Sequence, residues 1–295
     1  DGALHAGIGK EGSACAPHRR LPWIDPWGPA RCCMRHLDGA RLHLNAGLRP
    51  ALLDSLHRNH GHARAALPSM KPIAILQHEA TQGPGVLEEF LQQQGIAYEL
   101  IQPCHAGLAP QHAADFRGLV VLGSNHCANE PLPWIDAERC LLQDALAHDV
   151  PVLGHCFGAQ MLARAMGGRV WRNPCPNIGW SQAWVTPKAQ ALLQLPREIT
   201  LFNWHYDTFE IPQGAQRSMF GAYCLNKGFV HGRNWAFQGH LEVTAHSVQA
   251  WCDAGREELC QARGPAVQRQ AQILAQLPQR MQALRALAVR VYGAW

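Results

Sequence analysis

The stretch "PVLGHCFGAQ", residues 151–160, places a cysteine between two glycines where an apolar run meets a helical pattern. The run Pro151 to Leu153 is typical of a short buried strand, and the residues after Gly158 are typical of a helix. Small residues on both sides allow strand and helix backbones to approach closely in a tight turn. We therefore predict that Cys156 stands at a strand-to-helix elbow, at the carboxyl end of a strand where functional groups collect in parallel sheets.

Such an elbow suits a thiol for nucleophilic chemistry. The N-terminus of the following helix carries partial positive charge, which favours the thiolate of Cys156. The backbone N–H of Phe157 would point to the place where an oxyanion develops on an attacked carbonyl. A buried structural cysteine in a tight turn is the alternative, since cysteine is a common core residue. The ten residues alone do not decide between the two.

A second stretch, "WAFQGHLEVT" at residues 235–244, favours the catalytic interpretation. It has the pattern of a strand that ends in His240 and Glu242, and residues two apart in an extended chain project to the same side. A carboxylate beside an imidazole holds one tautomer and stabilises the protonated ring. A lone histidine there would be read as structural, but with Cys156 the pattern predicts a Cys–His–Glu triad.

The chain from Met70 onward alternates strand and helix patterns, which predicts an α/β fold with a doubly wound, mostly parallel sheet. From about residue 169 to residue 240 the pattern changes to short strand-like pieces, which predict a small antiparallel section. The predicted strands are 73–78, 97–102, 118–123, 151–154, 181–186, 199–205 and 234–239, and the predicted helices are 83–95, 136–149, 157–167 and 267–292, the last interrupted at Pro278.

Four motifs in this order resemble class I, triad-type glutamine amidotransferase domains, such as the glutaminase half of GMP synthase and its free-standing relatives. They are "GLVVLGSNHCANEPLPWI" (118–135), "GHCFGAQMLARAMGGRV" (154–170), "NWHYDTFEIPQGA" (203–215) and "GHLEVT" (239–244). The resemblance covers residues 70 to about 250 and implies a three-layer, flavodoxin-like fold. It does not extend to residues 1–69.

The resemblance also implies roles for individual positions. Cys156 would be the nucleophile, His240 the general base and acid, and Glu242 the residue that orients His240. The oxyanion hole would be formed by backbone N–H groups of Phe157 and of Gly123 or Ser124, and the substrate pocket would include Gln160, His205 and Asp207. The chain departs from the usual family pattern at Ser124, Tyr206 and Asn177, where glycine, glycine and glutamate are frequent.

The implied activity is release of ammonia from the glutamine side chain through a γ-glutamyl thioester, with no metal or organic cofactor. The substrate would be L-glutamine or another γ-glutamyl amide, and a separate synthetase could accept the ammonia. Two alternatives stay open. The protein could be a stand-alone γ-glutamyl hydrolase or peptidase, or it could be a non-catalytic regulatory module, although the intact triad argues against the latter.

Residues 1–69 differ from the rest of the chain. They hold nine Lys and Arg against five Asp and Glu, whereas residues 70–295 hold 17 of each. We predict a poorly ordered or mis-assigned extension at 1–69 and a folded domain at 70–295. The histidines at 57, 60 and 62 lack further ligands in register, so we expect no metal site there. The balanced charge of the main body argues against a nucleic-acid partner.

Composition bounds the remaining possibilities. The chain is 47% hydrophobic and 16% charged, which allows a sizeable core, and no apolar run reaches the roughly 18–20 residues of a membrane span. Eleven cysteines occur without a CxxC pair, and we see no secretory signal. We therefore expect a cytoplasmic protein with free thiols and no membrane partner.

Overall fold

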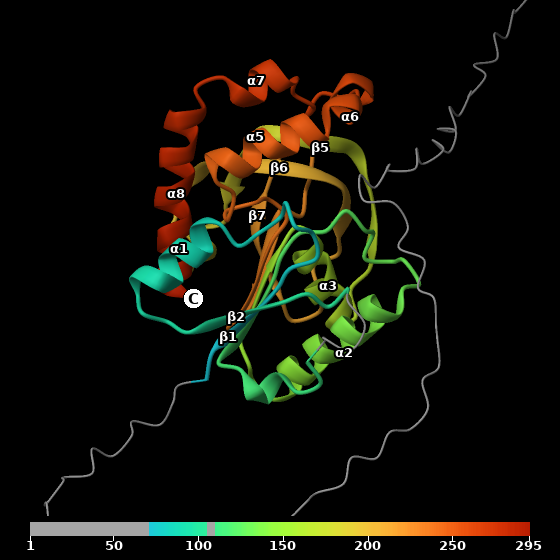
Figure 1. Ribbon diagram of the computed structural model, residues 1–295, viewed down its shortest axis with the longest axis vertical. Helices are drawn as coiled ribbons and strands as arrows, with labels where there is room; N and C mark the ends of the chain where they lie inside the picture. Colours follow the sequence, from blue (N-terminus) through green and yellow to red (C-terminus); the bar gives the residue numbers. More distant parts are fainter. Residues whose placement is uncertain (1–70, 105–109) are drawn as a thin grey trace, which may run out of the picture. The chain divides into compact units, whose positions relative to one another are not determined.

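The computed structural model describes residues 71–104 and 110–295. The extension predicted for residues 1–69, with the histidines at 57, 60 and 62, lies outside the described residues. Within them the strands form one sheet in the order β2-β1-β3-β4-β9-β8-β7-β5-β6. The doubly wound α/β sheet that the sequence predicts is confirmed (Figure 1).

The first half of the sheet is parallel and is the part predicted most closely from apolar runs. Each strand pairs in parallel register with its neighbour. All of them are short, and all but the edge strand Tyr98–Ile101 are largely buried, as expected when helices cover both faces. The parallel strands are β2 (Tyr98–Ile101), β1 (Ile73–Leu76), β3 (Gly118–Val121), β4 (Val152–His155) and β9 (Asn234–Phe237).

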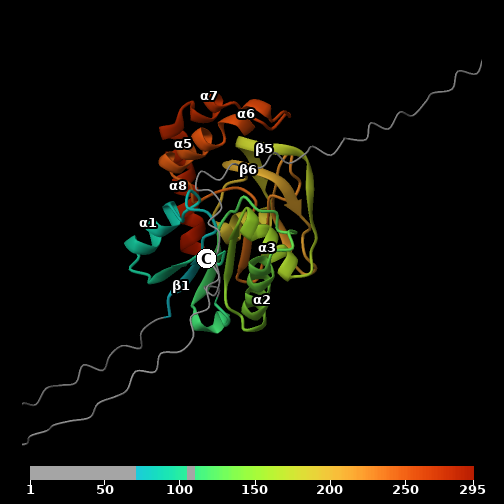
Figure 2. The same cartoon turned by 45° about the vertical axis from the view of Figure 1, so that its right-hand side comes forward.

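Two hydrophobic clusters make the sheet the middle of three layers. Ile73 and Ile75 of β1 face a cluster that includes α1 (Val86–Gln93) and the C-terminal helix. Ala74 and Leu76 face the other side, with α2 (Pro133–Ala147) and α3 (Phe157–Ala165). Figure 2 shows α2 and α3 on one side of the sheet and α1 and α8 on the other. The short 3₁₀ helix Ala113–Asp115 precedes β3.

The second half of the sheet is antiparallel and comprises four strands. They are β8 (Gly228–His231), β7 (Gln216–Phe220), β5 (Val170–Val185) and β6 (Glu198–Phe209), with α4 (Pro187–Leu193) between β5 and β6. The sequence predicts only the last part of β5, as 181–186, and the first part of β6, as 199–205, because the rest of each strand alternates too irregularly to be read by period. A register shift between Arg172 and Asn177 interrupts the pairing of β5 with β6.

Four helices close the chain. They are α5 (Ala245–Ala254), α6 (Arg256–Gln261), α7 (Gln270–Leu274) and α8 (Leu277–Ala294). Thr244 begins α5 with a capping box that uses Ser247. The predicted helix over 267–292 is divided at Ala275 and Gln276, and Gln276 has a φ of 54°. Pro278 therefore lies in the first turn of α8, where proline is well tolerated, and does not interrupt it.

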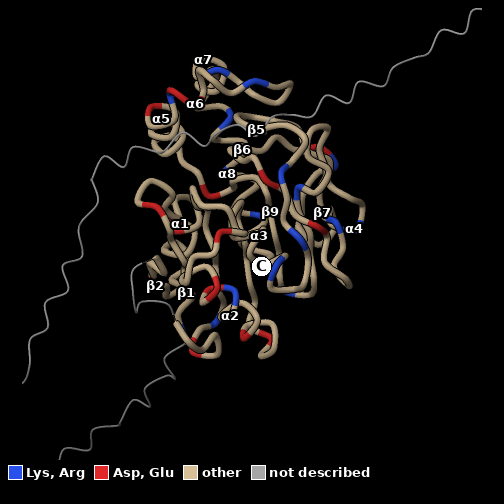
Figure 3. The backbone as a smooth tube through the Cα atoms, turned by 90° about the vertical axis from the view of Figure 1, so that its right-hand side faces the viewer, with Lys and Arg blue, Asp and Glu red and all other residues tan. Residues whose placement is uncertain are grey.

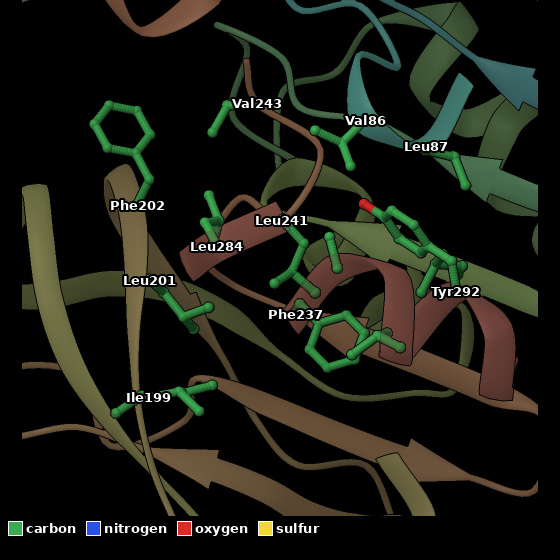
Figure 4. Packing of buried hydrophobic residues seen from close by; sticks show 14 of the residues in the cluster. Val86, Leu87, Ile199, Leu201, Phe202, Phe237, Leu241, Val243, Leu284 and Tyr292 are labelled. Atoms are coloured by element: carbon green, nitrogen blue, oxygen red, sulfur yellow. The ribbon is translucent and has the colours of Figure 1, made fainter. Parts of the chain in front are cut away.

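The core between the sheet and α8 extends toward the carboxyl ends of the strands. Tyr292 of α8 lies near Val86 and Leu87 of α1, and Phe237 of β9 packs in the same cluster (Figure 4). Both signs of charge occur on the described elements (Figure 3). Among the described residues, no helix combines the length and apolar character that crossing a membrane requires.

Candidate active site

Cys156 lies at the turn between β4 and α3, as the sequence predicts. Its backbone has φ 52° and ψ −105°, in a region that non-glycine residues rarely adopt. Such a conformation costs about 1–3 kcal/mol and persists only where the surrounding structure enforces it. Here β9 contributes, because the N–H of Cys156 donates to the carbonyl of Phe237 at 2.8 Å. The strained backbone is the signature of a nucleophile elbow.

The glycines around Cys156 are required by close backbone approach. A Cβ on Gly154 would lie 2.5 Å from the carbonyl oxygen of Gly158, and one on Gly158 would lie 2.1 Å from that of Val121. Both distances are well inside van der Waals contact with rigid backbone. The strand, the helix and the neighbouring strand β3 therefore meet at the elbow only because these positions carry no side chain.

His240 and Glu242 meet beside the elbow. Nδ1 of His240 lies 2.7 Å from Oε1 of Glu242, and both side chains are buried. Nε2 of His240 is buried too and has no partner in hydrogen-bonding geometry among the described residues. Cys156 is nevertheless close enough for its thiolate to act on the ring. The imidazole thus has one nitrogen fixed by a carboxylate and one available.

At this pair, the effect of neighbouring charges on the pKa values outweighs the effect of burial. Burial lowers the pKa of His240, but the Glu242 carboxylate and the Cys156 thiolate raise it above its ordinary value. Burial would raise the pKa of Glu242, but the charges of His240 and His155 hold it below its ordinary value. Nδ1 of His155 lies 3.4 Å from Oε2 of Glu242. These interactions favour the imidazolium form of His240.

The local structure of the His–Glu segment differs from the predicted strand end. Strand β9 ends at Phe237, and His240 lies beyond it in an isolated antiparallel bridge with Phe202 of β6. Glu242 follows in a bend, where its carbonyl accepts the N–H of Val86 at 2.8 Å. A Cβ on Gly85 would lie 2.2 Å from that carbonyl. Contacts with β6 and α1, rather than extended strand geometry, therefore hold the segment.

The predicted oxyanion groups lie on the loops after β3 and β4. Among the described residues, none accepts a hydrogen bond from the backbone N–H of Gly123, Ser124 or Phe157. Glu79 holds the loop after β3, since its Oε1 accepts the N–H of Asn125 at 3.1 Å. The three N–H groups are thus free to donate to a ligand.

The predicted substrate residues converge on one carbonyl. Nδ1 of His205 lies 3.0 Å from the carbonyl oxygen of Asp207, and Nε2 of Gln160 donates to the same oxygen at 3.4 Å. Burial first, then the charge of Lys227, lowers the pKa of His205 well below its ordinary value, so the ring is neutral. The Asp207 carboxylate lies 3.5 Å from Nη1 of Arg172.

Several buried polar residues around the site were not predicted. Nε2 of Gln238 donates to Sγ of Cys156 at 3.7 Å, and its Oε1 accepts from Gln160 at 3.3 Å. Lys227 is buried and donates to Oδ1 of Asn203 at 2.7 Å. Gln238 lies two residues before His240 in the same stretch, so spacing alone could have indicated it. Nothing in the sequence around Lys227 signals its burial.

A buried His–Glu pair, His78 and Glu138, was also missed. His78 directly follows the pattern of the first strand, at a carboxyl end where functional groups collect, and this was the available signal. Glu138 lies on the apolar face of α2 with Ile135 and Leu142. Among the described residues, no group of three or more His, Cys, Asp or Glu side chains is arranged to hold a metal ion.

Comparison with known proteins assigns the class. Residues 90–250, more than half of the chain, match the model of the family "Glutamine amidotransferase class-I". The chain belongs to this family. The resemblance that the four motifs carry is therefore confirmed at the level of the family.

Individual relatives agree with this class. A glutamine amido transferase from Methylobacillus flagellatus is 38% identical and superimposes with a TM-score of 0.75, over 77% of this chain and 94% of that chain. The glutamine amidotransferase-like protein YfeJ of Salmonella typhimurium is 24% identical over 65% of this chain and 84% of its own length. A GMP synthase subunit from Thermoplasma acidophilum is 30% identical over 43% of this chain and 63% of its own length.

Proposed function

We propose that the protein is a glutamine amidotransferase-type amidohydrolase that releases ammonia from the glutamine side chain through Cys156, His240 and Glu242. One observation carries the proposal. A strained elbow cysteine lies beside an imidazole whose Nδ1 is bound to a buried carboxylate and whose Nε2 is available. This is the arrangement of nucleophile, base and orienting residue that acyl transfer requires. Family membership supports the same reaction class.

In the first step, the thiolate of Cys156 attacks the amide carbon of glutamine. The raised pKa of His240 favours the imidazolium that accompanies the thiolate. Negative charge moves to the amide oxygen, where the free N–H groups of Phe157 and of Gly123 or Ser124 would hold it. Loss of one such donor typically costs about 100- to 1,000-fold in rate.

In the second step, the tetrahedral intermediate collapses. The carbon–nitrogen bond breaks, His240 gives its proton to the leaving nitrogen, and ammonia departs. The γ-glutamyl thioester on Cys156 remains. His240, now neutral, takes a proton from water as the water attacks the thioester, so that glutamate leaves and the thiolate returns. Glu242 keeps the ring oriented in both steps through the bond to Nδ1.

Gln160, His205 and Asp207 would shape the pocket for the rest of the substrate. The side chains of Gln160 and His205 are held on the Asp207 carbonyl, which makes this wall rigid. Tyr206, where the family frequently has glycine, lies under the guanidinium of Arg172 at 4.3 Å. This departure bears on which γ-glutamyl amide fits, and it leaves the triad unchanged.

The ammonia acceptor would be a separate synthetase. The Thermoplasma relative is by its name one subunit of GMP synthase, and its resemblance covers 43% of the present chain. We further propose a cytoplasmic location, with which the free cysteines among the described residues agree. A nucleic-acid or membrane partner is not part of the proposal.

The proposal is tested by comparing Cys156→Ala with wild type, with Cys127→Ala as the control. Cys127 is a free, half-buried thiol on the loop after β3. Glutamate and ammonia are measured from L-glutamine and from a panel of larger γ-glutamyl amides. We expect Cys156→Ala to lose activity by about 10⁴-fold or more, as nucleophile removal does elsewhere, and Cys127→Ala to keep it. Equal turnover in Cys156→Ala and wild type would overturn the assignment.

The substrate panel separates the open alternatives. Preference for L-glutamine, rising when an acceptor enzyme is added, supports an amidotransferase that works with a synthetase. Full activity of the isolated protein on larger γ-glutamyl amides supports a stand-alone hydrolase or peptidase. Inactivity on every amide, together with no covalent labelling of Cys156 by a glutamine-like electrophile, supports a regulatory module.

A further inference from the structure

A second His–Glu pair lies behind the loop that follows β3. Nε2 of His78 is 2.8 Å from Oε2 of Glu138, and both side chains are fully buried. Nδ1 of His78 is 3.0 Å from the carbonyl oxygen of Gly123. The pair thus connects the end of β1, helix α2 and the loop proposed to supply an oxyanion donor. It takes no part in the proton transfers described above.

Opposite an ionised Glu138, the two contacts of His78 require a protonated ring. A neutral imidazole has one N–H, so it can donate to the carboxylate or to the carbonyl, and its other nitrogen would then face an oxygen with no proton between them. An imidazolium donates to both. Burial lowers the pKa of His78, but the Glu138 charge and the two hydrogen bonds raise it above its ordinary value. The geometry and the electrostatics both favour a cation.

The position of this cation matters because of the peptide that it contacts. The carbonyl of Gly123 belongs to the same peptide unit as the N–H of Ser124, which has no acceptor among the described residues. The ring of His78 also packs edge-on against Phe157, with ring centroids 4.9 Å apart. One side chain therefore touches both loops that carry the proposed oxyanion donors.

We propose that the His78–Glu138 pair is a positioning device for the oxyanion hole, in which the His78 imidazolium orients and polarises the Gly123–Ser124 peptide. This inference rests on the proposed function. A hydrogen bond to a carbonyl strengthens the N–H of the same peptide as a donor, because hydrogen bonds in a chain polarise one another. Preorganised donors of this kind act where charge develops in the transition state.

Other titratable groups face His78. Glu79 adds a further negative charge that raises the pKa of His78. Sγ of Cys104 donates to the carbonyl of His78 at 3.7 Å, and burial, Glu79 and Glu138 raise the pKa of Cys104 to about 11, so this thiol stays neutral. The neighbouring Trp134 and Phe157 are uncharged. Glu138 is therefore the group whose removal changes the His78 charge most.

The test uses three substitutions and one control. His78→Gln places an amide near Nε2, so it keeps a donor for Glu138 and loses the contact with Gly123. His78→Asn places an amide near Nδ1 and keeps that contact. Glu138→Gln removes the charge that raises the pKa of His78. His126→Gln is the control, because His126 and Glu130 form a similar pair at 2.8 Å on the same loop, but exposed.

We expect His78→Gln to lower kcat on glutamine by about 10- to 100-fold, less than loss of an oxyanion donor itself, with KM changed by less than about threefold. His78→Asn restores most of the loss, and His126→Gln behaves as wild type. In Glu138→Gln, the fall of kcat on the alkaline side begins at lower pH than in wild type. A merely structural role would give no such shift.

Hydrogen exchange of residues 122–127 supplies a readout that needs no activity. We expect faster exchange at this loop in His78→Gln than in His126→Gln, and the same rate of Cys156 alkylation in both. If the protein hydrolyses no amide, the proposed function fails while the exchange still tests the positioning. Unchanged exchange in both His78→Gln and Glu138→Gln, or unchanged kcat in an active enzyme, overturns the inference.

Discussion

Two buried His–Glu pairs lie near the elbow cysteine, and they differ in what the second ring nitrogen of each histidine contacts. His240 and Glu242 are 2.7 Å apart, and His78 and Glu138 are 2.8 Å apart. In each pair the carboxylate raises the pKa of the histidine against the effect of burial. The remaining nitrogen of His78 binds the Gly123 carbonyl, whereas that of His240 has no partner among the described residues. The same chemical pair can thus hold a backbone or be available to move a proton.

The difference identifies the nitrogen that must stay free for catalysis. An imidazole with both nitrogens bound has no place for a substrate proton, however favourable its pKa. His240 is also the ring on which the Cys156 charge acts. Substitutions that change the charge, the partner or the packing of these buried groups therefore test the comparison directly.

The largest expected effect separates the two members of the proposed catalytic pair. His240→Ala removes both proton transfers and should lower kcat by about 10⁴-fold or more. Glu242→Gln should lower kcat by only about 100-fold. The amide of Glu242→Gln can still hold the ring, but it no longer stabilises the imidazolium. Steady-state kinetics on glutamine measure both variants.

The reverse order of these two variants would contradict an orienting role for Glu242. Circular dichroism and thermal unfolding of both proteins provide the control, because Glu242 also faces His155 at 3.4 Å. If Glu242→Gln unfolds, the variant His155→Gln, which leaves the His240–Glu242 bond intact, reports whether the loss arises from the second histidine.

Local sequence signals explain why one pair was predicted and the other was not. His240 and Glu242 are two residues apart, and "GHLEVT" is a contiguous motif. His78 and Glu138 are sixty residues apart, and they meet only because α2 packs beside β1 and β3. No periodicity connects a residue after one strand with a residue on a later helix. Pairs of this kind are products of tertiary packing.

The helices and strands also divide into those that local sequence patterns predict and those that they do not. The parallel strands and α1, α2 and α3 were predicted from apolar runs and helical spacing, because helices on both faces leave a strong apolar signal. The strands β7 and β8 and the helices α4, α5 and α6 were missed. These elements are short, with only four residues in β8, and α6 has few apolar residues. Tertiary contacts fix several of them: β7 pairs with β5, β8 pairs with β9, and Trp251 of α5 and Glu258 of α6 contact Trp204 of β6.

Among the described residues, Lys227 is a buried cation with no carboxylate partner, in contrast to the histidines of the two His–Glu pairs. Lys227 is 1% exposed and hydrogen-bonds Asn203, and burial lowers its pKa to about 8 despite the nearby thiols. A lowering of this size destabilises the folded state by about 3 kcal/mol at pH 7, where Lys227 is charged in both states. Lys227→Met removes this cost but also loses the hydrogen bond to Asn203. We therefore expect the substitution to raise the free energy of unfolding by about 1–2 kcal/mol in total.

The pH dependence gives the sign of this effect. Between pH 8 and 10.5 the unfolded chain binds the Lys227 proton and the folded chain loses it, so stability rises with pH in wild type. The difference between wild type and Lys227→Met should shrink over this window in urea titrations. Lys188→Met, on the exposed side of α4, is the control. The difference in stability between wild type and Lys188→Met should not change with pH. A constant difference between wild type and Lys227→Met from pH 7 to 11 would show that folding does not lower the pKa of Lys227.

The smallest expected effect concerns the aromatic rings packed on the two histidines. Trp251 meets His240 edge-on at 4.8 Å and donates its indole N–H to the carbonyl of Thr81 at 2.8 Å, while Trp134 lies at 5.3 Å from His78. Trp251→Phe loses the indole hydrogen bond, worth about 1 kcal/mol, and should lower kcat/KM by about two- to fivefold. Trp134→Phe keeps an aromatic face on a ring whose two nitrogens are already bound, so kcat/KM should change by less than about twofold. A larger loss in Trp134→Phe than in Trp251→Phe would mean that packing, rather than the engaged nitrogens, holds His78 in place.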